Sequence, residues 1–316
     1  MNYERLVPSL RAPKGRGNPQ RSSGLLRRVA PRNDNLISEL LQSAYRVFNK
    51  SDIDSPWLDA ELLLAHTVKK DRGWLLAHPE HRLTKPQRGR FLSLLRCRAA
   101  RVPLAYLTGE KEFYGRTFRV TRAVLIPRPE TEQLIEYALP YLKKLSTGSL
   151  VADIGTGSGC IAITLARLLP HLQLIATDTS AAALTVARAN ARRQRVNGRI
   201  RFLYDRNFSA LKNRKITAII SNLPYLSTHE RNSAQPELLY EPKRALVAGS
   251  RGDEAIRALL TIANKKRADE LLYMFLELNP RHALMLQRFA AATLANLQWN
   301  RGRDMANQAR FLIGVA

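Results

Sequence analysis

The chain has 316 residues, which suggests about two domains, and 45% of them are hydrophobic, a content typical of globular proteins. Its 51 Lys and Arg residues against 26 Asp and Glu give a formal net charge of +25, which favours contact with nucleic acid, a ribonucleoprotein or an acidic surface. The two cysteines, Cys97 and Cys160, exclude a disulfide scaffold and a cysteine-rich zinc module, and they fit a cytoplasmic location. No apolar run approaches the roughly 18 residues of a membrane helix and no secretory leader pattern is present, so we expect no membrane partner.

Residues 1–33 form a basic segment in which glycine and proline interrupt any helical period. It holds one acidic residue, Glu4, and the basic residues Arg5, Arg11, Lys14, Arg16, Arg21, Arg27, Arg28 and Arg32. We expect a disordered basic tail that attracts polyanions loosely. Because an arginine-containing, acid-poor start is also typical of transit peptides, import into an organelle stays open as an alternative.

Residues 34–101 are predicted to form a small helical domain. Apolar residues recur there at steps of three and four, at Leu36, Leu40, Leu41, Ala44, Tyr45 and Phe48. Two more helices are expected at 59–68 and 86–98, with Asp34 and Thr84 as helix N-caps. The next residues, 102–126, are β-like around Gly109 and Gly115 and predict a hairpin linker.

Residues 127–316 are predicted to form an α/β domain, because strands and helices alternate from Gly148 onward. The expected strands are 150–153, 173–178, 200–204, 215–221 and 271–278. Helices are expected to begin near Gly159, Ser180 and Asp253. This alternation predicts a doubly wound parallel sheet, to which the apolar segment 310–315 adds an edge strand.

A glycine-rich loop follows the first of these strands, with the sequence Asp153-Ile154-Gly155-Thr156-Gly157-Ser158-Gly159-Cys160. Glycines let the backbone turn tightly and approach a ligand closely. The absence of a following Lys-Ser/Thr pair excludes a P-loop. Asp178 ends the next strand, where an acid can accept both ribose hydroxyls of an adenosine ligand. These residues leave NAD and S-adenosylmethionine as candidate ligands.

The loop after the fourth strand distinguishes between these two ligands. Ligands bind at the carboxyl ends of parallel strands, so Asn222-Leu223-Pro224-Tyr225 is expected to face the glycine loop. This Asn-x-Pro-Tyr pattern resembles the Asn/Asp-Pro-Pro-Tyr motif of methyltransferases that modify planar amide or amine nitrogens. An amide nitrogen is a poor nucleophile, and the Asn222 side-chain oxygen and the Leu223 carbonyl can accept hydrogen bonds from its NH₂ group. Tyr225 can pack on the amide plane, while Pro224 keeps Leu223 extended.

Several further segments match a single family. They are residues 103–110, 112–115, 241–242, 245–249, 276–277 and 310–312, together with Leu-Ile-Pro-Arg-Pro-Glu-Thr-Glu at 125–132. With the glycine loop and residues 222–225, these segments closely resemble the PrmC/HemK peptide chain release factor glutamine methyltransferases. The resemblance covers roughly residues 35–316.

The resemblance implies a Rossmann-like, seven-stranded class I methyltransferase domain behind a small helical substrate-recognition domain and a hairpin linker. It implies transfer of a methyl group from S-adenosylmethionine to the glutamine of the Gly-Gly-Gln (GGQ) motif of class I release factors. The catalytic residues carried over by position are Asn222, Leu223, Pro224 and Tyr225. The cofactor-binding residues carried over are Gly155, Thr156, Gly157, Ser158, Gly159, Asp178 and Asn222. Asn207 or Phe208 stands for the family's adenine-contacting aromatic, and Leu223 replaces the family's proline.

Three other functions stay open at this point. The chain could methylate a glutamine of a large-subunit ribosomal protein, or an exocyclic amine of a nucleic acid. It could also be a binding protein whose catalytic site has decayed. The basic cluster Arg188, Arg192, Arg193, Arg195, Arg199 and Arg201 is interpreted as a solvated helix face that could also contact ribosomal RNA or an acidic release factor.

Other polar residues are given structural interpretations beside functional ones. Arg128 stands between two prolines, where pairing with a buried acid is the structural alternative to a role in the site. Glu130 and Glu132 fit an ordinary helix start. The six histidines show no metal-ligand spacing, so no metal is expected.

Overall fold

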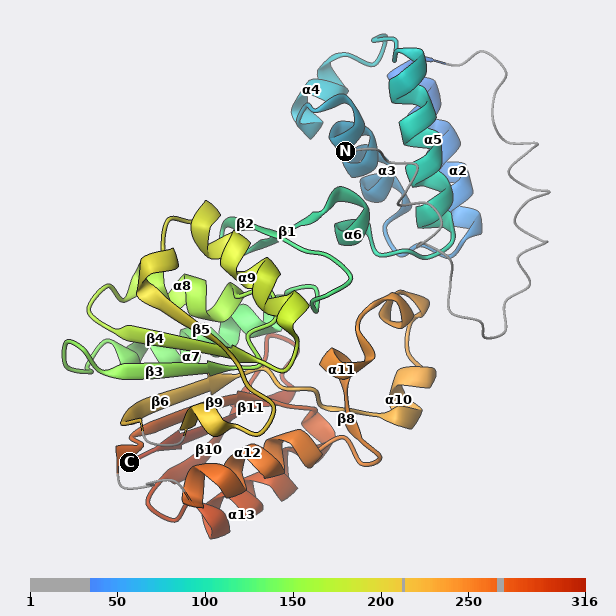
Figure 1. Cartoon of the computed structure of the whole chain (residues 1–316). Coiled ribbons are helices and arrows are strands. Elements are labelled where there is room, and N and C mark those ends of the chain that lie inside the picture. Colours follow the sequence, from blue (N-terminus) through green and yellow to red (C-terminus); the bar gives the residue numbers. More distant parts are fainter. Residues whose placement is uncertain (1–34, 212–213, 266–269) are drawn as a thin grey trace. The chain divides into compact units, whose positions relative to one another are not determined.

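The computed structural model describes residues 35–211, 214–265 and 270–316 (Figure 1). The predicted tail at 1–33 and the predicted cap Asp34 lie outside these described residues. The described chain forms two compact units: residues 35–109 with 236–240, and residues 110–235 with 241–316. The chain therefore leaves the second unit at residue 236 and returns to it at residue 241.

The first unit is helical, with α2 (Ile37–Lys50), α3 (Pro56–Val68), α4 (Arg72–Ala77), α5 (Lys85–Ala99) and α6 (Leu104–Thr108). The helices predicted at 59–68 and 86–98 are confirmed, and each begins slightly earlier than expected. Thr84 is confirmed as an N-cap, because its side chain accepts a hydrogen bond from the Gln87 backbone N–H. The sequence did not reveal α4 and α6, because helices of six and five residues are too short to show a period.

The helical unit has an apolar core and a largely buried ion cluster around Arg98. The stripe predicted along the first helix is largely buried, and only Tyr45 in it is exposed. Arg98 donates from Nε to Asp59 (2.7 Å) and from Nη1 to Glu237 (2.9 Å), and Arg101 also donates to Glu237 (2.8 Å). Glu237 belongs to the 3₁₀ turn Pro236–Tyr240, so these ion pairs hold that distant segment within the helical unit.

The second unit is built on a seven-stranded sheet with strand order β10-β11-β9-β6-β3-β4-β5. The strands are β3 (Leu150–Ile154), β4 (Gln173–Asp178), β5 (Ile200–Tyr204), β6 (Ile216–Ser221), β9 (Tyr273–Glu277), β10 (Gln298–Arg303) and β11 (Ala309–Val315). The five strands predicted from the alternating pattern are confirmed and run parallel to their neighbours in that group.

The expected place of the last strand was wrong. Residues 309–315 form β11, which lies between β9 and β10 and pairs antiparallel with both, so β11 is not an edge strand. The edge is β10, which the sequence did not reveal. Its residues are mostly polar, and only Trp299 and Gly302 are buried in it, so no apolar alternation marked it.

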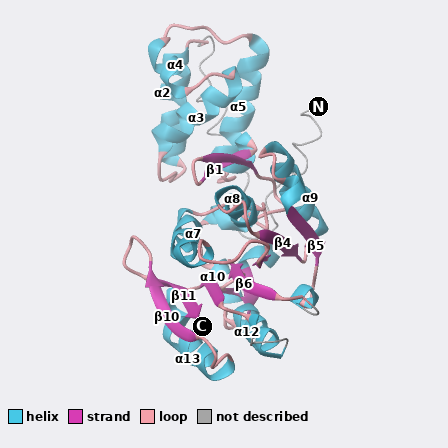
Figure 2. Ribbon diagram, turned by 90° about the vertical axis from the view of Figure 1, so that its left-hand side faces the viewer, coloured by secondary structure: helices cyan, strands magenta, loops and turns pink. Residues whose placement is uncertain are grey.

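Helices cover both faces of the sheet (Figures 1 and 2). On one face lie α7 (Pro129–Leu142), α8 (Cys160–Leu168) and α9 (Ala181–Arg193), and on the other lie α12 (Glu254–Lys265) and α13 (Ala283–Thr293). Each face of the sheet has its own apolar core, and neighbouring residues of β3 belong to different cores. Val151 packs toward α7, α8 and α9, and Ala152 packs toward α12 and α13. Burial on both faces is typical of parallel strands and explains their near-continuous apolar sequences.

Short elements complete the unit. The hairpin predicted within 102–126 forms only at β1 (Glu110–Phe113) and β2 (Arg116–Arg119), and α6 occupies the start of that range. Beyond β6 lie β7 (Leu226–Ser227), α10 (Thr228–Asn232), α11 (Lys243–Leu246) and β8 (Val247–Gly249). No helix among the described residues is long and apolar enough to cross a membrane.

Candidate active site

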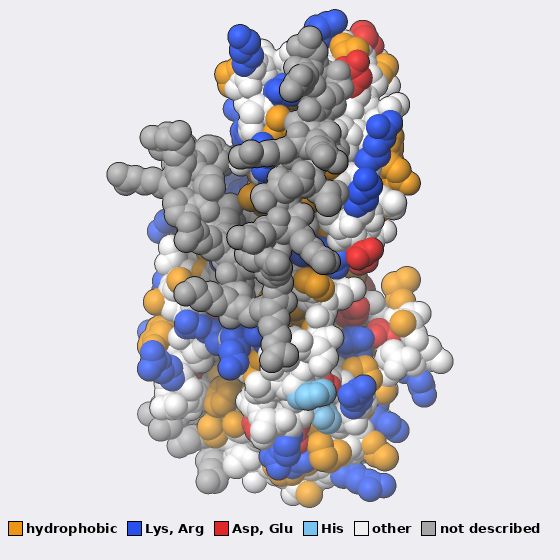
Figure 3. Space-filling model, turned by 90° about the vertical axis from the view of Figure 1, so that its right-hand side faces the viewer, with side chains coloured by type: hydrophobic (Ala, Val, Ile, Leu, Met, Phe, Trp, Pro, Cys, Tyr) orange, Lys and Arg blue, Asp and Glu red, His pale blue; other side chains and the backbone are white. Residues whose placement is uncertain are grey.

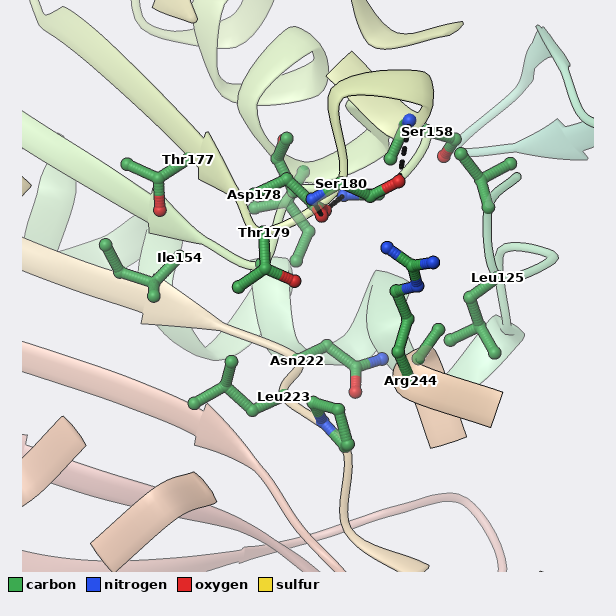
Figure 4. A pocket seen from close by; sticks show the side chains of 18 of the residues that line it. Leu125, Ile154, Ser158, Thr177, Asp178, Thr179, Ser180, Asn222, Leu223 and Arg244 are labelled. Atoms are coloured by element: carbon green, nitrogen blue, oxygen red, sulfur yellow. Dashed lines mark hydrogen bonds between the residues drawn. The ribbon is translucent and has the colours of Figure 1, made fainter. Parts of the chain in front are cut away.

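A pocket of about 220 Å³ lies in the second unit at the carboxyl ends of β3, β4 and β6 (Figure 4). It is lined by residues 155–158 of the glycine loop, Asp178, Phe208 and residues 222–224, so most of the predicted site residues meet there. Gly159, Asn207 and Tyr225 are not among its lining residues.

The glycine loop is held from behind by a buried carboxyl group. Asp153 Oδ2 accepts hydrogen bonds from Thr156 Oγ1 (2.6 Å) and from the Ala162 backbone N–H (3.1 Å). Burial raises the pKa of Asp153 to about 7, although these two hydrogen bonds oppose the rise. Asp153 thus ties the loop to the first turn of α8.

Gly159 serves helix packing rather than the pocket. Its φ of +83° is left-handed, and a Cβ there would come within 2.9 Å of Ile163 Cδ1 and 3.1 Å of Ala187 Cβ. Ile163 belongs to α8 and Ala187 to α9. A glycine at this position therefore lets α8 start close against α9.

Asp178 ends β4 and faces the glycine loop. Its carboxylate accepts hydrogen bonds from the backbone N–H groups of Gly157 (2.9 Å) and Ser180 (2.8 Å). Burial raises the pKa of Asp178, whereas these bonds and the charge of Arg244 act in the opposite direction. A carboxylate has about four acceptor positions, so Asp178 can still accept from a ligand's hydroxyl groups.

Asp205 shapes the loop after β5. Its carboxylate accepts from the backbone N–H groups of Asn207 (3.1 Å), Ser209 (2.9 Å) and Ala210 (2.7 Å). Burial alone would raise the pKa of Asp205, but these bonds lower it. The turn directs Phe208, at a φ of +52°, into the pocket wall, whereas Asn207 is exposed and does not line the pocket.

Residues 222–225 are held by the surrounding strands and by α7. Ser221 donates a hydrogen bond to the Ile154 carbonyl (2.5 Å), which joins the ends of β6 and β3. Asn222 Nδ2 donates to Thr131 Oγ1 (2.9 Å), and Tyr225 Oη donates to Glu277 (3.2 Å). Leu223 is buried, and a Cβ on Gly155 would lie 3.1 Å from its Cδ2 atom, so Leu223 packs directly against the glycine loop.

The structural interpretation of Arg128 is confirmed. Its guanidinium pairs with the buried carboxylate of Glu241, which also accepts from the Ile126 backbone N–H (3.0 Å). Arg128 also borders the pocket.

Three residues that sequence reasoning did not assign belong to this region. Thr131 and Arg244 line the pocket, and Glu277 lies behind it. Arg244 points into the pocket from α11, a helix of four residues that no sequence pattern marked (Figure 4). For Glu277, the sequence offered one indication of a role in the site, namely an acidic residue at the end of a predicted strand. Among the described residues, no group of three or more His, Cys, Asp or Glu side chains could hold a metal ion.

Comparison with known proteins places this site in a family. Residues 39–109 match the PrmC N-terminal domain, and residues 136–268 match the methyltransferase small domain. The release factor glutamine methyltransferase of Koribacter versatilis is 40% identical over 225 residues, which cover 71% of this chain and 79% of that protein. The chain belongs to the release factor glutamine methyltransferase family. The enzyme is therefore an S-adenosylmethionine-dependent protein-glutamine N-methyltransferase by class.

Other relatives agree with this membership. The release factor glutamine methyltransferase of Moorella thermoacetica is 39% identical over 224 residues, covering 71% of the enzyme and 79% of that protein. The protein of the same name from Vibrio cholerae is 39% identical over 228 residues, covering 72% and 79%.

Solved structures confirm the class I methyltransferase fold. The hMettl16 catalytic domain in complex with MAT2A 3′UTR hairpin 1 matches with a TM-score of 0.53 and 13% identity, over 74% of the enzyme and 81% of that chain. The complex with hairpin 6 gives a TM-score of 0.51 at the same identity, over 74% and 82%. At this identity the likeness concerns the fold alone.

Proposed function

We propose that the enzyme transfers a methyl group from S-adenosylmethionine to the side-chain amide nitrogen of the glutamine in the GGQ motif of class I peptide chain release factors. Family membership supports glutamine as the acceptor. The bacterial relatives favour a cytoplasmic reaction and give no support to import into an organelle.

The pocket residues fit the cofactor. Asp178 keeps free acceptor positions for the two ribose hydroxyls, and Phe208 offers an apolar ring for the adenine. Gly155 to Ser158 present their backbone to the same pocket. When bound, S-adenosylmethionine supplies an electrophilic methyl group.

Asn222 gives the main support. Its Nδ2 donates to Thr131 Oγ1 (2.9 Å), and no hydrogen bond to its Oδ1 is found among the described residues, which leaves that oxygen for a substrate NH₂. The Leu223 carbonyl is the second proposed acceptor. The φ restriction of the family's proline is absent here, but packing of Leu223 against Gly155 fixes the peptide instead.

Mass spectrometry after incubation with S-adenosylmethionine and a class I release factor tests this proposal. We expect one methyl group on the GGQ glutamine, and none when that glutamine is alanine. Asn222→Ala should lower kcat by roughly 10²- to 10³-fold, because one preorganised acceptor is lost. The matched control is Asn300→Ala, an exposed asparagine of β10 outside the pocket, which should keep wild-type activity.

The other candidate acceptors form the remaining arms of the experiment. A methyl group on a large-subunit ribosomal protein or on RNA, with the release factor unmodified, would replace the proposed substrate while keeping the cofactor site. Cofactor binding without transfer to any of these acceptors would favour a decayed site.

A further inference from the structure

A chain of hydrogen bonds runs behind the substrate side of Asn222. Asn222 Nδ2 donates to Thr131 Oγ1 (2.9 Å), and Thr131 Oγ1 donates to Glu277 Oε2 (2.7 Å). Tyr225 Oη donates to the other carboxylate oxygen, Oε1 (3.2 Å). Two of the proposed catalytic residues, Asn222 and Tyr225, are thereby tied to one carboxyl group.

Three elements of the second unit create this chain. Thr131 lies in the first turn of α7, and Glu277 is the last residue of β9. Ser221 of β6 pairs with Leu276 of β9, so Asn222 and Glu277 are the next residues along two neighbouring parallel strands. Thr131 is 2% exposed and Glu277 is 1% exposed, so water does not compete for these bonds.

The chemistry of the groups gives the chain a direction. An ionised carboxylate accepts hydrogen bonds but cannot donate. Thr131 must therefore spend its single hydroxyl hydrogen on Glu277, which leaves only an acceptor toward Asn222. An acceptor selects the NH₂ end of the asparagine amide and turns the oxygen away from Thr131.

We propose that Thr131 and Glu277 are positioning residues that fix the orientation of the Asn222 amide, so that its oxygen is presented to the substrate. This inference rests on the proposed function, in which the Asn222 oxygen accepts from the glutamine NH₂. The two ends of an asparagine amide have nearly the same shape, so packing alone does not select between them. A flipped Asn222 would present two N–H donors to a substrate that is itself a donor.

The first test separates kcat from cofactor binding. Thr131→Val keeps the side-chain shape but removes the hydroxyl, and we expect kcat on the release factor to fall roughly 10- to 100-fold. Affinity for S-adenosylhomocysteine should stay within about 3-fold. Thr131→Ser restores the hydroxyl and should recover kcat to within about 3-fold of wild type. A Thr131→Val enzyme with wild-type kcat would overturn the inference.

The second test uses substrate polarity. The wild-type enzyme should bind a release factor with the GGQ glutamine far better than its Gln→Glu variant, because a glutamate side chain offers acceptors only. In Thr131→Val this preference should fall at least about 10-fold, because Asn222 can then present its NH₂ group. In Glu277→Gln the preference should also fall, but by less. An unchanged preference in both variants would mean that Asn222 is oriented by something else.

A third measurement needs no substrate and distinguishes failure of the inference from failure of the proposed function. In ¹⁵N-labelled enzyme, the side-chain amide of Asn222 is assigned by its loss in Asn222→Ala. One of its hydrogens should exchange with water at least about 10-fold more slowly than those of the exposed Asn300, and Thr131→Val should remove this protection. If wild-type enzyme leaves the release factor unmethylated, the proposed function fails, and this exchange rate still decides the inference. Fast exchange in the wild type would overturn it.

Discussion

Asp178 ends its strand with backbone N–H groups already bound to both carboxylate oxygens. These bonds orient the carboxylate before any ligand arrives, so a ribose that binds there need not order it. The negative charge also strengthens every hydrogen bond that it accepts. This residue should therefore affect cofactor affinity more than the chemical step.

Asp178→Ala is expected to weaken S-adenosylhomocysteine binding by roughly 10- to 100-fold, the value of one or two charge-assisted hydrogen bonds. Asp178→Asn should lose less, because the amide oxygen still accepts. Isothermal titration calorimetry measures both. Asp54→Asn, at an exposed acid of the helical unit, is the matched control and should bind normally. Equal affinity of Asp178→Ala and wild type would remove Asp178 from the cofactor site.

Glu277 gives the enzyme a titratable group behind the proposed catalytic residues 222–225. Burial raises its pKa to about 7, while hydrogen bonds from Thr131 and Tyr225 oppose the rise. The ionisable groups that face it are Tyr225 from the loop after β6, Arg310 from β11, Glu130 from α7 and the Cys160 thiol from α8. Above this pKa the carboxylate only accepts, whereas below it the protonated group can donate to Thr131 and release the Thr131 hydroxyl toward Asn222.

Only the ionised form of Glu277 holds the Asn222 amide in the proposed orientation. We therefore expect kcat to rise with pH through about 7, as Glu277 loses its proton. Single-turnover methylation between pH 6 and 8.5 measures this profile. Glu277→Gln has no proton to lose and should give a flat profile at a lower rate. Asp153 also has a pKa of about 7, so Asp153→Asn is the control. An inflection that survives in Glu277→Gln and disappears in Asp153→Asn would assign it to Asp153.

Among the elements, those with strong periodicity were predictable and those with short or polar sequences were not. The apolar runs of β3, β4, β6 and β9 marked the sheet. In contrast, β10 packs through Trp299 and Gly302 while its other residues face solvent, so neither a run nor an alternation marked it. The consequence was an error of topology, because without β10 the last strand looked like an edge.

In the site, too, contiguous sequence motifs were predictable and contacts between distant residues were not. The glycine loop, Asp178 and residues 222–224 are contiguous motifs at strand ends, and the structure brings them to one pocket. Thr131 and Glu277 are 146 positions apart, and only the fold shows that they touch. Arg244 could not be predicted either, since its helix has four residues.

Exposed arginines gather around the end of α9 and on the edge strand β5. Arg192, Arg195 and Arg201 are exposed, and Asp205 just beyond β5 is buried. Glu110 pairs with Arg193, at the end of α9. Lys and Arg side chains are also spread across the visible surface in Figure 3. A surface of this kind should bind polyanions through counterion release.

Charge reversal tests whether these exposed arginines bind polyanions. Arg192→Glu with Arg201→Glu should leave the melting temperature nearly unchanged, because both side chains are exposed. The slope of the logarithm of the RNA-binding constant against the logarithm of salt concentration should become shallower by about 0.7 for each lost phosphate contact, with single-stranded RNA as the ligand. Arg288→Glu with Arg301→Glu makes the same change in net charge at exposed positions of α13 and β10. If both pairs behave alike, the net charge of the protein and not the position of Arg192 and Arg201 controls the binding.

On the scale of the whole molecule, the two units are interlaced along the chain. The chain passes between them at 109/110, 235/236 and 240/241, so the helical unit is completed by five residues that lie between two parts of the methyltransferase unit. Those residues, Pro236–Tyr240, are held by Arg98 and Arg101 through Glu237, and by the bond from Tyr240 Oη to the Ala100 carbonyl (2.7 Å). Unfolding of the helical unit would therefore also free residues 236–240, which follow residues 222–225 along the chain.

Arg98 is the centre of that attachment, because it pairs with both Asp59 and Glu237. Arg98→Ala leaves the buried Asp59 carboxylate without its partner and takes one of two from Glu237, so we expect unfolding free energy to fall by about 3–5 kcal/mol. Arg96→Ala removes an exposed arginine from the same helix and should change it by less than about 0.5 kcal/mol. Urea unfolding measures both, and limited proteolysis at 236–240 reports release of the segment. If Arg98→Ala is as stable as Arg96→Ala and the segment resists cleavage, the ion cluster does not hold the two parts of the chain together.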